Sequence, residues 1–85
     1  MEIRITPRAE ELLRELAGLV AAANRRYFRQ RWYIYENSGY HVHVYKRGWV
    51  YDGFEDVVPI DTRCTEENLQ AAVAAMRREL KEINQ

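Results

Sequence analysis

The chain has 85 residues, of which 47% are hydrophobic and 31% charged, a composition typical of a globular domain and far from that of a disordered chain. Thirteen basic and thirteen acidic residues give a formal net charge of zero, which argues against a strongly basic nucleic-acid-binding protein. A single cysteine excludes an internal disulfide, and the longest apolar run, residues 17–23, is too short to span a membrane. We expect one compact domain over residues 1–85. Because the start of the chain lacks the pattern of a secretory signal, we also expect a cytoplasmic protein.

A first amphipathic helix is predicted over residues 6–29. Thr6 can accept a hydrogen bond as its N-cap, and Pro7 suits the first helical position, where a missing N–H costs nothing. Glutamates near the start and arginines near the end complement the helix dipole. Apolar side chains recur at steps of three and four and form one stripe, which consists of Ala9, Leu13, Leu16, Val20, Ala23 and Tyr27, widened by Leu12 and Leu19.

The segment after this helix predicts antiparallel strands joined by tight turns. The sequences Asn-Ser-Gly (37–39) and Lys-Arg-Gly (46–48) each place glycine third, as in a three-residue hairpin loop. In that register Tyr35 lies opposite His41, and Tyr45 lies opposite Trp49. Alternation then puts Trp32, Ile34, Val42, Val44 and Val50 on one face of the sheet. The other face, which we call the aromatic face, carries Tyr33, Tyr35, His41, His43, Tyr45, Trp49 and Tyr51.

The residues after Tyr51 allow two interpretations. The chain could turn at Asp52 and Gly53 into a short fourth strand that ends at Val58. Pro59 would then restrict this strand to an edge of the sheet, because proline cannot donate a hydrogen bond to a second neighbour. The same residues could instead form an extended connection to the last helix.

A second amphipathic helix is predicted over residues 65–84. Thr65 can cap it, and Glu66 and Glu67 follow in the first turn, where the helix dipole favours acids. Its apolar stripe consists of Leu69, Val73, Met76, Leu80 and Ile83. The whole pattern predicts an α+β domain of order α-β-β-β(-β)-α, in which two amphipathic helices cover one face of an antiparallel sheet of three or four strands.

Both helix stripes need the aliphatic face of the sheet, which leaves the aromatic face without a cover from this chain. Three interpretations stay open. Cross-strand aromatic pairs could simply stabilise a solvated sheet, each contributing about 0.2–1 kcal/mol. The face could instead bind another protein or a second copy of the chain, because interface centres are rich in Tyr and Trp and poor in Lys, Glu and Asp. It could also stack the bases of a single-stranded nucleic acid.

Basic residues could serve either binding interpretation, as a polar rim around a protein interface or as contacts to phosphates. They are Arg25, Arg26, Arg29, Arg31, Lys46 and Arg47. The arginines near the end of the first helix also have an ordinary explanation, because the helix dipole favours cations there.

Catalytic and metal signatures are weak. His41 and His43 form a His-x-His pair whose rings point the same way, but a metal site would need a further ligand, so we predict no metal and no cofactor. Cys64 has no histidine nearby in the sequence. Its place just before a helix N-terminus could lower the pKa of its thiol and make it mildly reactive. The sequence contains no phosphate-binding loop or nucleophile motif, and we do not expect an enzyme.

Two resemblances bear on function. The order of elements, together with Ser-Gly-Tyr-His-Val-His-Val-Tyr (38–45) and the alanine-rich segment 65–76, resembles double-stranded RNA-binding domains, which implies RNA binding. Glu66 and Glu67 stand where that family has lysines that grip phosphates. In size and layout the chain is also similar to small inhibitors from phages and mobile elements, including anti-CRISPR proteins, which implies action on a protein partner.

We therefore predict a non-enzymatic protein-binding module, of the regulator or inhibitor type, that acts through the aromatic face and does not involve a membrane. A homodimer that uses the same face is a variant of this hypothesis. The alternative is a binder of single-stranded or structured nucleic acid that uses the same rings and the cluster of arginines.

Overall fold

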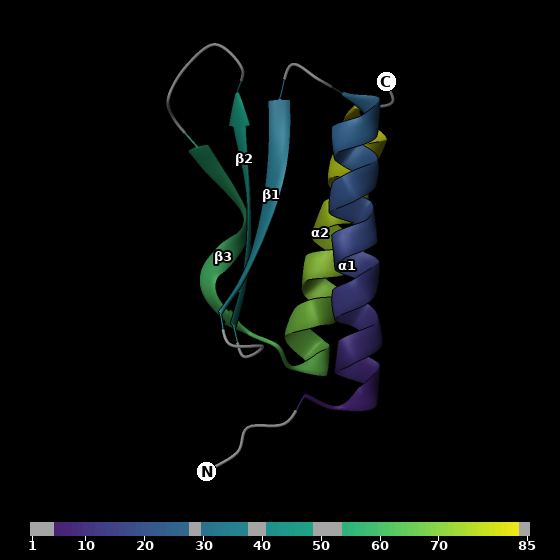
Figure 1. Ribbon diagram of the computed structural model, residues 1–85, viewed down its shortest axis with the longest axis vertical. Helices are drawn as coiled ribbons and strands as arrows, with labels where there is room; N and C mark the ends of the chain where they lie inside the picture. Colours follow the sequence, from purple (N-terminus) through teal and green to yellow (C-terminus); the bar gives the residue numbers. More distant parts are fainter. Residues whose placement is uncertain (1–4, 28–29, 38–40, 49–53, 84–85) are drawn as a thin grey trace.

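The computed structural model of the chain describes residues 5–27, 30–37, 41–48 and 54–83. In chain order it contains α1 (Pro7–Arg26), β1 (Gln30–Asn37), β2 (His41–Gly48), β3 (Phe54–Arg63) and α2 (Glu66–Ile83) (Figure 1). This order confirms the predicted α+β fold, and the described residues form a three-stranded antiparallel sheet in the order β1-β2-β3.

Both predicted helix caps are confirmed. The Thr6 Oγ1 atom accepts a hydrogen bond from the Ala9 N–H at 3.1 Å, and Pro7 is the first residue of α1. The Thr65 Oγ1 atom accepts one from the Asn68 N–H at 3.1 Å at the start of α2. Helix α1 ends at Arg26, earlier than the predicted residue 29, because Tyr27 already has an extended backbone with φ −143° and ψ 120°.

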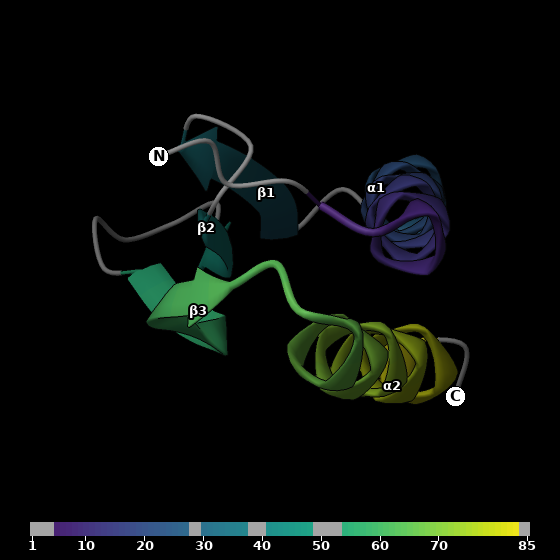
Figure 2. The ribbon, with the colours of Figure 1, turned by 90° about the horizontal axis from the view of Figure 1, so that it is seen from below.

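The two helices lie side by side, begin at the same end of the molecule and run in the same direction (Figure 1). At that end the Thr6 hydroxyl donates to the Glu66 Oε1 atom at 2.9 Å, which joins the start of α1 to the first turn of α2. Both helices lie on one side of the sheet, with α1 nearer β1 and α2 nearer β3 (Figure 2). The structure therefore has two layers, and the helices cover a single face of the sheet.

The core lies between these two layers. The sheet contributes Trp32, Val42, Val44 and Val58, and all four side chains are buried. The centre of the α1 stripe is Leu12 and Leu16, while Leu13 is only half-buried at its side. The buried apolar residues of the helices are Ala9, Leu12, Leu16, Val20 and Ala23 in α1, and Leu69, Ala72, Val73, Met76 and Leu80 in α2.

The predicted register of the first hairpin is wrong by two residues. Tyr35 lies opposite His43, where the prediction placed His41, because Asn37 continues β1 and pairs with His41. A shift of two residues preserves the alternation of side chains, since residues i and i+2 of a strand point to the same face. The predicted division of β1 and β2 into an aliphatic and an aromatic face therefore holds.

The predicted second hairpin is also wrong. Lys46 and Arg47 do not form a loop but belong to β2, where they pair with Glu55 and Phe54 of β3. The predicted strand residues Trp49, Val50 and Tyr51 lie outside the described residues. The polar sequence Lys-Arg-Gly misled the prediction because Lys46 finds an ionic partner on the helix side of the sheet, so its charge does not require a loop.

Strand β3 contains the predicted edge-strand proline. The pairs Val42–Thr62 and Val44–Val58 enclose one residue of β2 but three residues of β3, Pro59 among them. A proline cannot donate a ladder hydrogen bond, so it is accommodated in an irregular stretch of an outer strand. Strand β3 continues to Arg63, whereas the predicted fourth strand ended at Val58. The strand curves strongly in Figure 1.

Helix α1 is attached to β1 through the side chain of Asn24. The Trp32 N–H donates to the Asn24 Oδ1 atom at 2.7 Å, and the Asn24 Nδ2 atom donates to the Trp32 carbonyl at 2.9 Å. The amide thus satisfies both backbone groups of Trp32 in the way that a neighbouring strand would. The indole of Trp32 is 1% exposed, so this contact fixes the largest side chain of the core.

The substitution Asn24→Ala should lower the free energy of unfolding by about 1–3 kcal/mol, because two partly buried backbone groups lose their partners. Urea denaturation followed by tryptophan fluorescence measures the change. Gln70→Ala on the exposed side of α2 is the control and should change stability by less than about 0.5 kcal/mol. Equal stability of the two variants would show that the contact does not hold α1 to the sheet.

Candidate functional site

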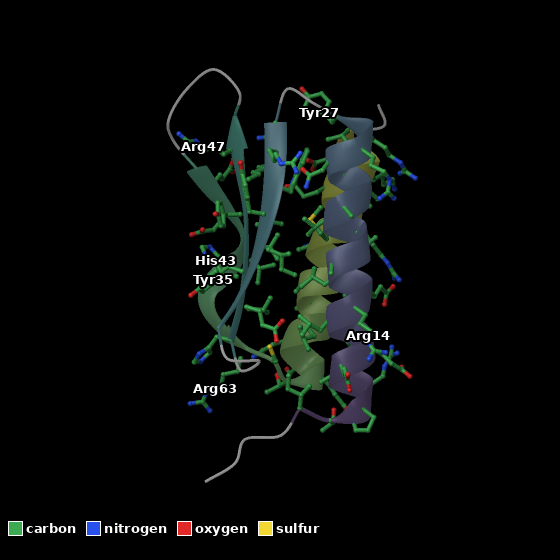
Figure 3. All side chains as sticks on the ribbon, viewed as in Figure 1. Arg14, Tyr27, Tyr35, His43, Arg47 and Arg63 are labelled. Atoms are coloured by element: carbon green, nitrogen blue, oxygen red, sulfur yellow. The ribbon has the colours of Figure 1, made fainter. Side chains whose placement is uncertain are left out.

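The candidate site is the side of the sheet that faces away from both helices, which we call the outer face. Cross-strand partners point to the same face, so the register assigns its members. Tyr35, His43, Arg47 and Arg63 project on this side in Figure 3, opposite the helices. The residues of the outer face whose side chains the structure describes are Arg31, Tyr33, Tyr35, His41, His43, Tyr45, Arg47, Asp56 and Arg63.

Five of the seven residues predicted for the aromatic face lie together on the outer face, and Trp49 and Tyr51 lie outside the described residues. Tyr33 and Tyr45 are direct cross-strand partners whose rings stack, with centroids 5.0 Å apart and planes at 14°. The His43 ring lies 5.2 Å from that of Tyr45 at a tilt of 38°. Tyr45 is therefore held between neighbours, whereas Tyr33 is 37% and Tyr35 60% exposed.

His43 is bound to an acid on the neighbouring strand. Its Nε2 atom lies 2.5 Å from the Asp56 Oδ1 atom, and this contact links β2 to β3 across the outer face. In the part of the chain that the structure describes, no group of three or more His, Cys, Asp or Glu side chains could hold a metal ion.

Arginines flank the aromatic rings. Arg31 and Arg47 are direct cross-strand partners at one end of the outer face, and Arg63 lies opposite His41 at the other end. Arg63 was not predicted for this face, because the predicted strand ends at Val58, whereas β3 continues to Arg63. Asp56 lies within the predicted strand, but its residue type suggested only a role in backbone geometry. The β-branched residues Val57, Val58, Ile60 and Thr62 favour a strand and are the signal that could have extended it.

The remaining basic residues that the sequence singled out are not gathered on the outer face. Arg25 and Arg26 are exposed in the last turn of α1, and Arg29 lies outside the described residues. Lys46 points to the helix side of the sheet, where its Nζ atom lies 2.9 and 3.1 Å from the two carboxylate oxygens of Glu79. Lys46 therefore does not border the outer face.

The contact between Lys46 and Glu79 is part of the core boundary. Only 15% and 16% of these side chains are exposed, and the Trp32 Nε1–H also donates to the Glu79 Oε2 atom at 3.4 Å. One carboxylate of α2 thus serves a lysine of β2 and an indole of β1. These two partners compensate the cost of placing the charge of Glu79 at the boundary of the core.

A groove of about 310 Å³ lies between β3 and α2. It is lined mainly by small apolar side chains, with Asn68 and Arg78 as its polar members. The apolar lining residues are Val57, Val58, Ala71, Ala72 and Ala75. Among the residues that the structure describes, its lining holds no acid, no histidine and no nucleophile, so these residues offer shape and apolar surface but no catalytic group.

Cys64 is buried, and burial together with the nearby Glu36 carboxylate raises the pKa of its thiol above the ordinary value of 9.0. The sequence had suggested a lowered pKa from the start of α2, and this expectation is wrong. Burial removes the thiol from water and thereby disfavours the thiolate, and Thr65, not Cys64, caps the helix.

Comparison with known proteins finds no matching family model, no matching curated protein and no matching solved structure. In the part of the chain that the structure describes, no helix is both long enough and apolar enough to cross a bilayer.

Cys64 should react with iodoacetamide at pH 8 at least about tenfold more slowly than a peptide thiol, because both its burial and its raised pKa keep it a neutral thiol. A folded-state pKa above the unfolded value stabilises the fold below the unfolded pKa, and this contribution is lost as the pH rises through the folded pKa. Mass spectrometry of alkylation between pH 7 and 10, in buffer and in urea, measures both effects. Equal rates in buffer and in urea would contradict this assignment.

Proposed function

We propose that this protein is a non-catalytic protein-binding module that acts through the outer face. One observation carries the proposal: both helices cover the same side of the sheet, and neither lies over the tyrosines and arginines on the other side (Figures 2 and 3). Tyr and Arg are the residue types that, with Trp, most often supply binding energy at protein interfaces.

The geometry of the outer face suits binding because its side chains are already ordered. Tyr33 is stacked on Tyr45, and His43 is bound to Asp56. Ordering a free side chain at an interface costs about 0.5–1.5 kcal/mol, and a side chain that is held before binding avoids much of this cost. Tyr35, the most exposed aromatic residue described, is then the natural anchor for an apolar group of the partner.

A purely structural role explains less of the outer face. A stacked pair such as Tyr33 and Tyr45 stabilises a sheet, but Tyr35 exposes more than half of its surface and gains little from its neighbours. Residues that do not serve the fold point to a role outside it.

The proposed action is regulation or inhibition of a partner protein by occupation of its surface. This mode is typical of the small phage and mobile-element inhibitors, anti-CRISPR proteins among them, to which the chain is similar in size and layout. In the described part of the outer face, no Ser, Thr or Cys side chain lies beside the His43–Asp56 pair, so we propose binding without catalysis. A cytoplasmic site of action would suit the buried free thiol of Cys64.

A second candidate, binding of single-stranded nucleic acid, is favoured by the arginines that share the outer face with the tyrosines. Phosphate contacts from Arg31, Arg47 and Arg63 would make such binding fall steeply as the salt concentration rises. The zero net charge of the chain weighs against this candidate.

The variant Tyr33→Ser/Tyr35→Ser should lose at least about tenfold in recovery of a partner protein from host lysate, because the exposed anchors are removed. Urea denaturation should show that it stays folded, with a loss of about 2 kcal/mol or less from the broken ring pair. Gln70→Ser/Ala74→Ser, on the exposed side of α2, is the matched control and should recover the partner as the wild type does.

Light scattering on the same proteins tests the homodimer variant, in which the wild type has twice the monomer mass and the tyrosine variant does not. If wild type, control and tyrosine variant all recover the same proteins, or none, and all are monomers, the outer face is structural and the proposal is wrong.

A further inference from the structure

Strand β1 has an open edge, because among the described residues it pairs with β2 on one side and with no strand on the other. In an antiparallel pair the backbone groups of alternate residues point toward the partner strand, and those of the residues between them point away. The Asn24 amide binds both backbone groups of Trp32, so the groups of this residue point away from β2. By the same alternation, the N–H and C=O groups of Ile34 and Glu36 also point away from β2.

The outward backbone groups of Ile34 and Glu36 are available to a partner. In the described part of the chain, no hydrogen bond joins these groups to a helix, a turn or a side chain. Strand β1 starts beside α1 and diverges from it toward its other end (Figure 1), which explains why Asn24 reaches Trp32 but not the residues beyond it. A single copy of the chain therefore leaves two N–H and two C=O groups to bind water.

A strand of a second copy suits this edge better than a flexible peptide does. The open stretch allows four inter-strand hydrogen bonds, two in each of two residue pairs. A flexible segment would lose its conformational freedom to gain these few bonds, whereas β1 of a second copy is ordered before it binds. The stretch is also self-complementary, since a two-fold axis places the donors of one copy on the acceptors of the other.

Charge and the Asn24 contact select one antiparallel register. Ile34 opposite Ile34 of the second copy would put Glu36 opposite Trp32, whose backbone groups are already bound. Glu36 opposite Glu36 of the second copy would bring like charges together, which destabilises a sheet. With Ile34 opposite Glu36 of the second copy, both open residues of each copy are paired and neither conflict arises.

The selected register also gives Tyr35 a neighbour. Its side chain is 60% exposed in the single chain, and the two-fold axis places it opposite Tyr35 of the second copy. The backbone groups of Tyr35 point toward β2, so this pair is of the type that lacks hydrogen bonds and brings side chains closest, with Cα atoms about 4.5 Å apart. The two rings can therefore pack against each other, and such aromatic pairs stabilise a sheet.

We propose that this protein forms a symmetric dimer in which β1 pairs antiparallel with β1 of a second copy, with Ile34 opposite Glu36. The two sheets then form one continuous sheet, with the helices of both copies on the same side, because opposite residues of paired strands point to the same face. The inference goes beyond the proposed function, since it concerns the edge of the sheet and does not require the outer face to bind a partner.

Sedimentation velocity of the full chain from micromolar to millimolar concentration should show a monomer–dimer equilibrium. Glu36→Pro removes the N–H that the second copy would accept but spares the pairing with β2, because this N–H points away from β2. The loss of two of the four hydrogen bonds should raise the dissociation constant at least about tenfold. Glu36→Val is the matched control, because it removes the same carboxylate and keeps the N–H, and it should dimerise as the wild type does.

The variants Tyr35→Glu and Tyr35→Lys test the two-fold axis without a change in the backbone. Each variant alone should dimerise at least about fivefold more weakly than the wild type, because like charges meet across the axis. A mixture of equal amounts should recover the association, because opposite charges then meet. Urea denaturation should show that both variants are folded, since Tyr35 is the most exposed aromatic side chain described.

The inference is overturned if the wild type is monomeric at every concentration, if Glu36→Pro dimerises as well as Glu36→Val, or if the mixed Tyr35 variants associate no better than either alone. If Glu36→Pro does not fold, the mixture of Tyr35 variants decides the question. A lysate protein that binds a monomeric wild type and Glu36→Val but not Glu36→Pro would assign the edge to a strand of another protein and refute the dimer.

Discussion

The arrangement of this protein depends on how Trp32 is held. The Asn24 amide binds both backbone groups of this residue, and its indole reaches the Glu79 carboxylate while its ring lies 6.1 Å from that of Tyr27. These contacts connect α1, β1 and α2 at a single buried side chain. Because alternate residues of a strand point to opposite faces, fixing Trp32 toward the helices also turns Arg31 and Tyr33 away from them. The outer face is thus a direct result of the way in which the core is closed.

Neighbouring cations of β2 illustrate how the two sides of the sheet use charge differently. Lys46 points toward the helices and is neutralised by Glu79 in a partly dry environment, whereas Arg47 points outward beside Arg31. A lysine can extend its aliphatic stem over apolar neighbours and place one compact charge on a buried acid. An arginine offers a planar set of donors that suits a ligand from outside. Composition alone counts these residues together, but their adjacent positions in a strand turn their side chains to opposite faces of the sheet.

Features that depend on residues close together in the sequence were predicted correctly. The errors concern features that depend on contacts between residues far apart in the sequence. Thr6 and Thr65 act within one helical turn, so their capping roles could be predicted from neighbouring residues. The division between Val44 and Tyr45 survived a wrong register because a shift of two residues preserves alternation. The partner of β2 could not be identified from turn residues, since it depends on the distant contact between Lys46 and Glu79 and on the irregular stretch around Pro59. The raised pKa of Cys64 likewise depends on burial by remote segments, which no local pattern reveals.

The side chain of Asn24 has a consequence for how copies of this protein meet one another. The outermost strands of an open sheet present unpaired backbone groups on which another chain can add a strand, a common route to aggregation. On β1 the Asn24 amide occupies both backbone groups of Trp32, and on β3 the irregular pairing around Pro59 interrupts a straight ladder. At these two places the margins of the sheet are poorly suited to strand addition. The same amide that joins α1 to the sheet thus also hinders strand addition at Trp32.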